Sequence, residues 1–540
     1  MNIYGKIILA AAFLVSTACT GTAVIDGNGL HDALEAAEDG QSIVLRKGTY
    51  DYYPESGTDM WLDPSGSSSG IKHVLFPIVG KKNLTVDGSG SRLVIHGDAF
   101  PFAVKDCRNI TLKNFEIVTK YPSTISMKIE EKDKDGFSAK IIGDVCPLTT
   151  LPDGNVEFDL EGVSLSSRDG RISLHSVDRI AIQYVMSPGS KGDKDEFPAG
   201  FSGVRWNRPE EDLLRFDYYG DTHPKSMEVM YGIGENVVVN LEEKRSRACF
   251  FMENCEGINV KDVHIVRAGG MGLVAQQCGD ITLDGLDIWP EIPGCVTTTA
   301  DMMYFVSCFG KLHIMNCRQG FSLDDAMNVH GVYHRIESLD EGWLTLRAMH
   351  EAHAGFFPYR QGDSLEIIDA HTREVFARTA VKELVKDTDD PYVCRVRISG
   401  PDFTGEREEL EGLLVENVTL YPEVLLEGNN FDTIPHCRLS GRGGITVRDN
   451  VFKNCYGAIY AYDLADYWYE SGRISTLVIE DNEFIDPNGM GGDCVIDVGV
   501  SGWYGEGTPA VHDKVILKGN RIENLTGEFA RISGVKDYTP

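Results

Sequence analysis

Short stretches in which apolar and polar residues alternate recur along the chain, and several of them share one phrase. The phrase is a cysteine, a turn pair and then alternating residues: CRNITLKNFEI (107–117), CEGINVKDVHI (255–265) and CGDITLDGLDI (278–288), with CFGKLHIMNC (308–317) one residue longer. A period of two predicts β-strands, and the return of one phrase indicates a structural repeat. We therefore expect stacked, strand-rich coils.

A second phrase recurs in the last quarter of the chain. It reads LLEGNNF (425–431), ITVRDNVF (445–452), LVIEDNEF (477–484) and VILKGNRI (515–522), with asparagines at 429, 450, 482 and 520 in the same turn. Their intervals of 21, 32 and 38 residues correspond to one coil plus loops of variable length. This predicts an all-β parallel β-helix (a solenoid) with an asparagine ladder, whereas a β-propeller needs about 40 to 50 residues per blade.

The ends and interruptions of the repeat predict the domain organisation. An amphipathic helix around Leu30 to Ala37, followed by a strand at Ser42 to Leu45, would cover the open end of the first coil. Residues 121–247 and 332–412 break the repeat, and the second block shows period-two strands typical of a small antiparallel barrel. We expect a signal at 1–20, a cap and first coils at 21–120, an inserted β domain at 121–247, central coils at 248–331, an inserted β-barrel at 332–412 and C-terminal coils at 413–540.

Composition narrows the class of partner. The 540-residue chain is 42% hydrophobic, which is ample for a packed core. Its net charge of -31 argues against nucleic acid and anionic membrane surfaces, because phosphate binding needs an excess of Lys and Arg. A neutral substrate fits this charge better, and no residue pattern indicates an oligomeric state.

The N-terminus reads as an export signal. Lys6 precedes the apolar run Ile7 to Val15, and small residues precede Cys19. We expect an exported protein, periplasmic or at the cell surface, with membrane attachment only through a lipid on Cys19; plain secretion is the alternative. The other 12 cysteines include no CxxC zinc pair, and their places in the coil phrases predict buried free thiols rather than disulfides.

Three carboxylates fall in the stretch from Thr297 to Gly331. Asp324 and Asp325 follow Asp301 by 23 and 24 residues, close to one coil, so they would lie side by side on stacked turns. Adjacent residues of a regular strand face opposite sides, and one Asp of the pair would enter the core at a cost of several kcal/mol, roughly. We therefore predict a strand irregularity near Ser322 to Asp325.

Crowded carboxylates suit glycoside hydrolysis. The reaction needs one acid to protonate the leaving oxygen and one base to activate water, and neighbouring acids push their pKa values apart. An inverting enzyme keeps the two groups about 6.5 to 9.5 Å apart. The alternative is an acidic loop that is merely solvated or binds calcium.

The stretch ADMMYFVSCFGKLHIMNCRQGFSLDDAMNVHG (300–331), with RGGITVRDNVF and WYESG later, resembles glycoside hydrolase family 110, the bacterial exo-α-1,3-galactosidases. The resemblance implies a right-handed parallel β-helix with two β-barrel insertions. It also implies inverting removal of terminal α-1,3-linked galactose, as in blood group B or linear α-galactosyl glycans, without metal or other cofactor. The family's motif aspartates fall on Asp301, Asp324 and Asp325. By similarity to polygalacturonases, Asp324 would be the acid while Asp301 and Asp325 hold the water. Met302 stands where many relatives have Gly.

Further residues are candidates for substrate binding. Glu470 beside Trp468 offers a hydroxyl acceptor next to an aromatic face, and Asn328 and His330 share one face of a strand. Tyr304 is a weaker candidate for contact with the substrate. The spacing of His330 and His334 suits a helical metal site, but the surrounding pattern is not helical, so we predict no metal.

Three other functions stay open. A polysaccharide lyase on the same fold would need calcium and a Lys or Arg base, for which the stretch offers only Lys311 and Arg318. A polygalacturonase-like hydrolase would use the same three-carboxylate layout. A carbohydrate-binding solenoid without turnover would have little use for three crowded carboxylates.

Overall fold

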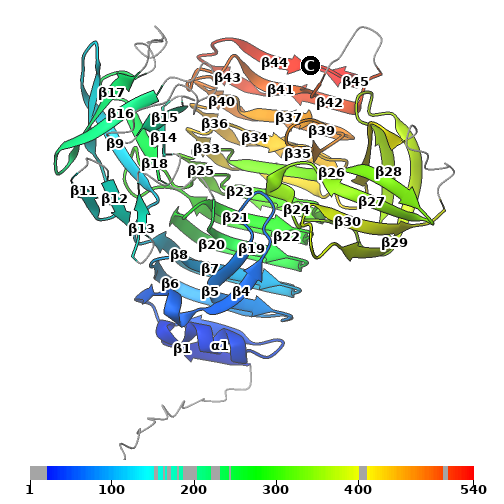
Figure 1. Cartoon of the computed structure of the whole chain (residues 1–540), viewed down its shortest axis with the longest axis horizontal. Helices are drawn as coiled ribbons and strands as arrows, with labels where there is room; N and C mark the ends of the chain where they lie inside the picture. The colour runs from blue at the N-terminus through cyan, green and yellow to red at the C-terminus, as the bar shows by residue number, and fades with distance from the viewer. Residues whose placement is uncertain are drawn as a thin grey trace, which may run out of the picture.

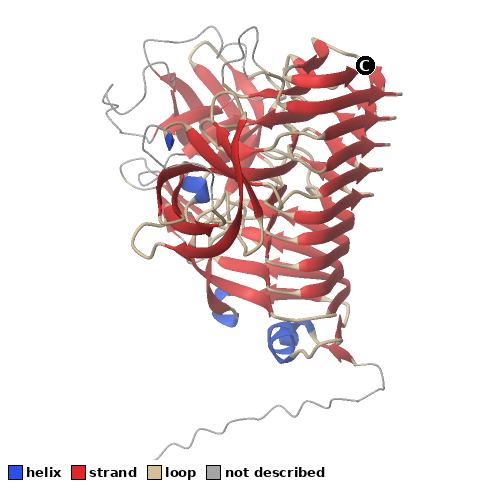
Figure 2. Cartoon of the chain, turned by 90° about the vertical axis from the view of Figure 1, so that its right-hand side faces the viewer, coloured by secondary structure: helices blue, strands red, loops and turns tan. Residues whose placement is uncertain are grey.

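A computed structural model of the chain describes residues 21–540 apart from 151, 153–155, 162–163, 167–171, 179–181, 187–202, 220–230, 242–244, 401–409 and 503–508. Its centre is a stack of coils that rises from a short helix at the N-terminal end to the C-terminus (Figure 1). Seen from the side, the strands of successive coils lie one above another as parallel rungs (Figure 2). The predicted all-β parallel β-helix is confirmed, and among the described residues no helix is long and apolar enough to cross a bilayer.

The first strand of each coil pairs in parallel with its counterpart in the next coil. These strands are β1 (Thr22–Ile25), β2 (Ser42–Leu45), β6 (Thr85–Ile95), β8 (Arg108–Thr119), β20 (Glu256–Arg267), β22 (Gly279–Ile288), β24 (Phe309–Met315), β32 (Glu423–Glu427), β35 (Gly444–Arg448), β39 (Thr476–Glu480), β42 (His512–Lys518) and β45 (Val535–Thr539). Ile258 lies opposite Ile281, which confirms the 23-residue coil.

Two further rows complete the coils. A row of short strands, parallel to one another, follows the asparagine turn: β25 (Arg318–Gly320), β33 (Asn430–Asp432), β36 (Val451–Lys453), β40 (Glu483–Ile485) and β43 (Arg521–Glu523). The last row, also parallel, is β5 (Gly70–Val79), β7 (Ala99–Lys105), β19 (Ala248–Glu253), β21 (Met271–Gln276), β23 (Met303–Val306), β26 (Met327–Asp340), β34 (Cys437–Leu439), β37 (Ile459–Asp463), β41 (Cys494–Val500) and β44 (Glu528–Ile532). The candidate acids lie just ahead of β23 and β26.

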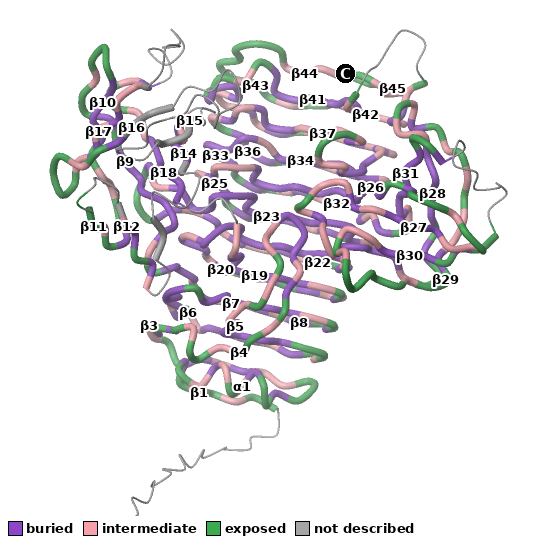
Figure 3. The backbone as a smooth tube through the Cα atoms, in the orientation of Figure 1, coloured by how far each residue is buried: buried purple, intermediate pink, exposed green. Residues whose placement is uncertain are grey.

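The N-terminal end is closed as the sequence predicts. The helix α1 (Leu30–Ala36) buries Leu30 and Leu34 against the core, and β2 occupies the predicted strand. Around the cap lie the 3₁₀ turns η1 (Gly27–Gly29) and η2 (Pro54–Ser56), with β3 (Thr49–Tyr52) and β4 (Thr58–Leu62). The apolar core continues from Leu30 to Leu517, and Figure 3 shows the buried backbone concentrated in the coil strands.

The asparagine ladder is present. The Asn429 amide donates to Asn450 (2.9 Å), Asn450 donates to Asn482 (3.0 Å) and Asn482 donates to Asn520 (3.1 Å). The residue before each asparagine has a positive φ: Gly428 (65°), Asp449 (55°), Asp481 (57°) and Gly519 (66°). Glycine and aspartate tolerate this left-handed backbone, which is why each phrase reads GN or DN.

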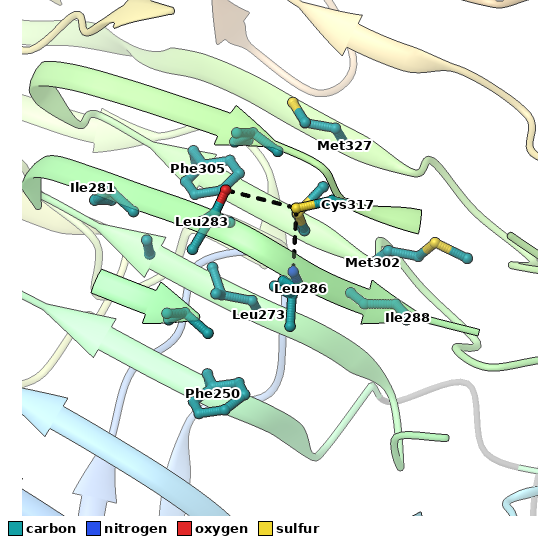
Figure 4. Close-up of a cluster of buried hydrophobic side chains, with 14 of the residues drawn as sticks. Phe250, Leu273, Ile281, Leu283, Leu286, Ile288, Met302, Phe305, Cys317 and Met327 are labelled. Atoms are coloured by element: carbon teal, nitrogen blue, oxygen red, sulfur yellow. Dashed lines mark hydrogen bonds between the residues drawn. The ribbon is translucent and has the colours of Figure 1, made fainter. Parts of the chain in front are cut away.

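The cysteines form a second stack. Of the described residues, all cysteines are free thiols, and the Cys255 and Cys278 sulfurs each accept a backbone N–H from the preceding cysteine of the stack at 3.4 Å. Figure 4 shows Cys317 in the core, where its sulfur accepts from the Leu286 N–H (3.3 Å) and donates to the Leu283 carbonyl (3.7 Å). The predicted buried free thiols are confirmed for the described cysteines except Cys295, which is a free thiol but only partly buried.

Two inserted barrels flank the coils (Figure 1). The first closes through β9 (Thr124–Lys132), β10 (Gly136–Ile141), β17 (Leu213–Tyr219), β16 (Gly203–Glu210), β15 (Ile182–Met186), β14 (Ile172–Ser176) and β18 (Asn236–Asn240), beside a small sheet of β11 (Leu148–Thr150), β12 (Val156–Asp159) and β13 (Ser164–Ser166). Its pairs are antiparallel except β15 with β16. The second closes through the far half of β26, β27 (Trp343–Ala348), β30 (Val393–Ile398), β29 (Val375–Lys386), β28 (Ser364–Asp369) and β31 (Leu413–Asn417), all antiparallel.

Candidate active site

The coil register brings Asp301 and Asp325 together. Met303 in β23 lies opposite Met327 in β26, an offset of 24 residues, so Asp301 and Asp325 stand at matching positions two residues earlier. The Met302 N–H donates to the Asp325 carbonyl at 3.0 Å, which fixes the two backbones as neighbours. The predicted one-coil spacing of these aspartates is confirmed.

The chain around Asp324 and Asp325 is not a regular strand. Between Gly320 and Met327 it bends at 323, 324 and 326, and Phe321 has a φ of 64°. The Ser322 hydroxyl lies 2.8 Å from that of Thr298 on the preceding coil and accepts from the Asp324 N–H at 3.1 Å. Because the pleat is broken here, both carboxylates reach the same pocket, and the predicted irregularity is confirmed.

The three carboxylates form one cluster in a narrow cavity. One oxygen from each of Asp301, Asp324 and Asp325 lies within 4.8 Å of the others. Asp301 and Asp325 are buried, whereas the side chain of Asp324 is 32% exposed. The cavity has a volume of about 30 Å³, which is room for a few water molecules rather than a hexose. A sugar can therefore enter only if side chains at the mouth shift.

This spacing differs from the sequence-based expectation. The two carboxyl groups of an inverting pair lie about 6.5 to 9.5 Å apart, and these oxygens are closer. Two oxygens less than 5 Å apart can, however, share one water, because each O–H···O bond spans about 2.7 to 2.8 Å. The cluster is thus dimensioned to hold a water molecule between two of its members.

Basic side chains pair with two of the acids. Arg245 donates to Asp324 at 2.6 Å, and His436 Nδ1 lies 3.2 Å from Asp325 Oδ1. Arg438 bridges two elements, with its Nη2 3.1 Å from Glu470 and its Nε 3.6 Å from Asp325.

The pKa values follow from burial and charge. Burial raises the pKa of Asp301 well above its usual range, and the negative charges of Asp324 and Asp325 add to this. Burial also raises the pKa of Asp325, but hydrogen bonding to His436 and the charge of Arg438 oppose it. The buried pair therefore keeps a proton to higher pH than isolated aspartates, and the contacts of Asp325 favour its ionised form over that of Asp301.

Glu470 carries a negative charge deep in the pocket wall. Burial alone would raise its pKa, but Arg438, His330 and His353 with the Asn328 amide lower the pKa below its usual value. The residue lies on β38 (Glu470–Ser471), which pairs with β26 at Val332. A fixed, ionised carboxylate here can accept hydrogen bonds from sugar hydroxyls.

The other predicted binding residues lie near the acids, with one difference. Asn328, Tyr304 and Trp468 line the cavity with Glu470. His330 is buried behind Glu470 instead of on the cavity wall: its Nδ1 bonds to the Gly331 carbonyl at 2.6 Å, and its Nε2 lies 3.6 Å from Glu470. Of the two residues expected to share one face of the strand, Asn328 lines the cavity, whereas His330 contacts Glu470 from behind.

Several residues of the site were missed by sequence reasoning. Arg438 lies opposite Asn328 in the coil register, and His436 precedes it by two, so the alternation in HCRL (436–439) was a visible signal. The inserted barrel between Asn328 and Arg438 hid their register. Arg245 enters the pocket from the end of the first inserted segment and His353 from the turn between β27 and β28 of the second, where no repeat marks them.

The geometry of the acidic cluster is also compatible with cation binding. Three carboxylate oxygens within 4.8 Å could hold a metal ion as well as a water. Metal independence therefore stays a prediction.

Comparison with known proteins identifies bacterial relatives. No family model matches the chain. The chain is 28% identical over 449 residues to α-1,3-galactosidase A of Bacteroides thetaiotaomicron, covering 80% of this chain and 72% of the relative. It is 27% identical to α-1,3-galactosidase A of Shewanella woodyi (89% and 76%) and to α-1,3-galactosidase B of Parabacteroides distasonis (84% and 74%). Among solved structures, a polygalacturonase from Erwinia carotovora aligns with a TM-score of 0.41 and 8% identity over 96% of both chains.

Proposed function

We propose that this chain is an exo-acting α-1,3-galactosidase, a glycoside hydrolase that removes terminal α-1,3-linked galactose from glycans, and that it belongs to glycoside hydrolase family 110. The observation that carries the proposal is the cluster of Asp301, Asp324 and Asp325 in one pocket of a chain whose curated relatives are named α-1,3-galactosidases over most of its length.

The roles of the acids follow from their depth. Asp301 and Asp325, at the buried end, hold the attacking water between them, and Asp325 takes its proton because His436 and Arg438 favour its ionised form. Asp324, the most exposed of the three, protonates the leaving oxygen, which lies toward solvent when galactose fills the pocket. This order gives a single displacement with inversion.

Substrate entry would rearrange the mouth of the pocket. The cavity is too small for a sugar, and Arg245 holds Asp324 in an ion pair. A carboxylate in an ion pair has no proton to donate, so Asp324 must separate from Arg245 and take up a proton from solvent before it can protonate the leaving oxygen. An incoming galactose that displaces Arg245 from Asp324 makes room for the sugar and removes the positive charge that keeps Asp324 ionised. Glu470 and Asn328 then bind hydroxyl groups, while Trp468 and Tyr304 contact the ring.

The polysaccharide lyase alternative gains two candidate bases that the sequence did not reveal. Arg245 and Arg438 both lie beside the acids. Burial would lower their pKa values, but the surrounding carboxylates outweigh it and raise the pKa of both guanidinium groups. A protonated guanidinium cannot abstract a proton, so the site favours hydrolysis over lyase chemistry.

The test is replacement of each acid by its amide. Asp301→Asn, Asp324→Asn and Asp325→Asn should each lower kcat on an α-1,3-galactosyl disaccharide by about 10²- to 10⁴-fold, because each removes a proton-transfer or water-holding group. Galactose release is followed by NMR, in which inversion shows β-galactose as the first-formed anomer. Asp449→Asn, the same change in an exposed turn, is the control and should retain wild-type turnover.

Two outcomes would contradict the proposal. Full turnover in all three variants would remove the acids from the mechanism, and α-galactose formed first would exclude single displacement. The same assay after dialysis against EDTA tests metal independence, with unchanged kcat as the expected result.

We further propose that the protein is exported, periplasmic or at the cell surface. This rests on the N-terminal sequence pattern alone, since Cys19 and the rest of residues 1–20 lie outside the described residues.

A further inference from the structure

The outer wall of the pocket is a tight loop that ends at Glu470. The Leu464 N–H donates to the Glu470 backbone carbonyl at 3.0 Å, and the Tyr469 N–H donates to the Asp466 backbone carbonyl at 2.7 Å. Within this loop Trp468 lines the cavity, while the neighbouring Tyr467 is 70% exposed. The loop thus presents one aromatic ring to the pocket and the next to solvent at its mouth.

The backbone of this loop is strained. Tyr467 has a φ of 22° and Tyr469 a φ of 55°, both in the region that non-glycine residues rarely adopt. Strain of this kind costs about 1 to 3 kcal/mol per residue and is retained mainly at functional sites. A single exposed aromatic residue is ordinary on a protein surface, but one held there against backbone preference needs a reason.

The ring of Tyr467 is also fixed in place. Its centroid lies 5.1 Å from those of both Trp468 and His350, with edge-to-face geometry in each case, and the His350 and Trp468 rings are 4.3 Å apart. His350 Nδ1 accepts the Ala352 N–H at 3.1 Å, so the neutral ring carries its hydrogen on Nε2. The wall therefore combines a rigid aromatic surface with a hydrogen-bond donor.

We propose that Tyr467, with His350, binds the sugar on the leaving-group side of the scissile bond and so sets the preference for the glycan that carries the terminal galactose. This inference rests on the proposed function, since galactose must fill the buried end of the pocket. The next sugar then lies at the mouth, beside the aromatic wall. Its C–H face can pack on the tyrosine ring and its hydroxyls can accept from His350, which is the usual division of contacts for a pyranose.

Two substrates separate this role from catalysis. An α-1,3-galactosyl disaccharide places a sugar at the mouth, whereas α-galactosyl fluoride has a leaving group too small to reach the wall. Tyr467→Ala should lower kcat/KM for the disaccharide about three- to tenfold, mainly through KM, because one aromatic contact is lost. The kcat/KM for the fluoride should change less than twofold, and Tyr467→Phe, which keeps the ring, should restore disaccharide hydrolysis.

The outcomes are distinguishable. Tyr538→Ala, at a tyrosine of similar kind that is 42% exposed on the last coil, controls for loss of a surface ring and should match the wild type. If Tyr467→Ala leaves both substrates unchanged or lowers both equally, the leaving-group subsite is wrong while the proposed function stands. If the wild-type protein hydrolyses neither galactoside, the proposed function fails and the subsite fails with it.

Discussion

At the scale of single residues, the site is governed by the cost of crowding acids in a buried place. Asp301 has its pKa raised well above the usual range, first by burial and then by Asp324 and Asp325, with Glu470 adding to them and Arg245 opposing them. The carboxylates are kept close for chemistry at the expense of stability.

The destabilising effect of a charge on buried Asp301 predicts a pH-dependent gain of stability in the variant Asp301→Asn. An aspartate with a raised folded-state pKa binds its proton more tightly when folded, so the fold loses stability as the pH rises from about 3.9, the unfolded value, through the folded-state pKa. The amide carries no charge. We therefore expect Asp301→Asn to melt at a higher temperature than the wild type at pH 7, with the difference shrinking toward pH 4, while activity is lost.

Thermal unfolding at both pH values measures the effect. Asp449→Asn serves as the control for the chemical change in an exposed turn and should shift the melting temperature equally little at either pH. A variant Asp301→Asn that is no more stable than the wild type at pH 7 would show that the Asp301 charge is fully compensated by Arg245 and its other neighbours.

At the scale of elements, stacked side chains hold the coils in register. Each inner amide of the asparagine ladder donates to the asparagine of the next coil and to a backbone carbonyl of the preceding coil, as Asn450 does with Asn482 and with Leu426. Because these amides are buried, loss of one asparagine leaves the polar atoms of its neighbours without a hydrogen-bond partner from protein or water.

Removing an inner rung should therefore cost more than removing the last one. Asn450→Ala leaves the backbone N–H and side-chain amide of Asn429 without their acceptor, and we expect a loss of about 2 to 5 kcal/mol in the free energy of unfolding. Asn520→Ala removes the terminal, partly exposed rung and should cost less than half as much. Urea unfolding followed by circular dichroism compares them, and equal losses would contradict a cooperative ladder.

A second group of buried contacts positions the strand that carries Glu470. Arg373 from the second barrel pairs with Asp463 at 2.8 Å, and Asp463 also accepts from Tyr333 (2.7 Å) and from the Gly472 N–H (3.2 Å). Arg373 is 3% and Asp463 0% exposed, so removing either partner would leave the other as an unpaired buried charge. The barrel thus fixes β38, and with it the carboxylate of Glu470.

At the scale of the whole molecule, the inserted barrels act as parts of the site. Val177 and Val238 of the first barrel pack against Val296, with Phe321 and Leu323 of the segment that leads to Asp324. The second barrel supplies His353 and Ala352 to the pocket. The solenoid alone would present the acids on an open face, and the barrels enclose them.

A substitution that weakens this contact between the first barrel and the segment before Asp324 should lower kcat. Val238→Ser places a hydroxyl against an apolar cluster and shortens the side chain, so we expect the segment before Asp324 to loosen and kcat to fall roughly tenfold, because small misplacements of catalytic groups are costly. Lys128→Ser, an exposed change on the same barrel, should leave kcat unchanged. Wild-type kcat in Val238→Ser would show that the barrel does not support the acids.

Much of this architecture was readable from the sequence because it repeats. The coil phrases predicted the parallel strands, the asparagine ladder and the buried thiols, and the 24-residue spacing placed Asp301 beside Asp325. Local rules decide these features: period two defines a strand face, and GN or DN defines the turn. The adjacent acids even required the broken strand that the structure contains.

Only the tertiary structure decided what surrounds the acids. Arg438 lies one coil from Asn328, but the inserted barrel and its loops separate them by 110 positions in the sequence and conceal this register. Arg245 arrives from the end of the other inserted segment, and His330 lies behind Glu470 rather than in the pocket. The position of Arg245 depends on how a long insertion folds back onto the coils, and no repeat carries that information. The sequence by itself thus determined the solenoid and its three aspartates, because both obey a local period. Long-range packing decided their charge partners and the closed pocket.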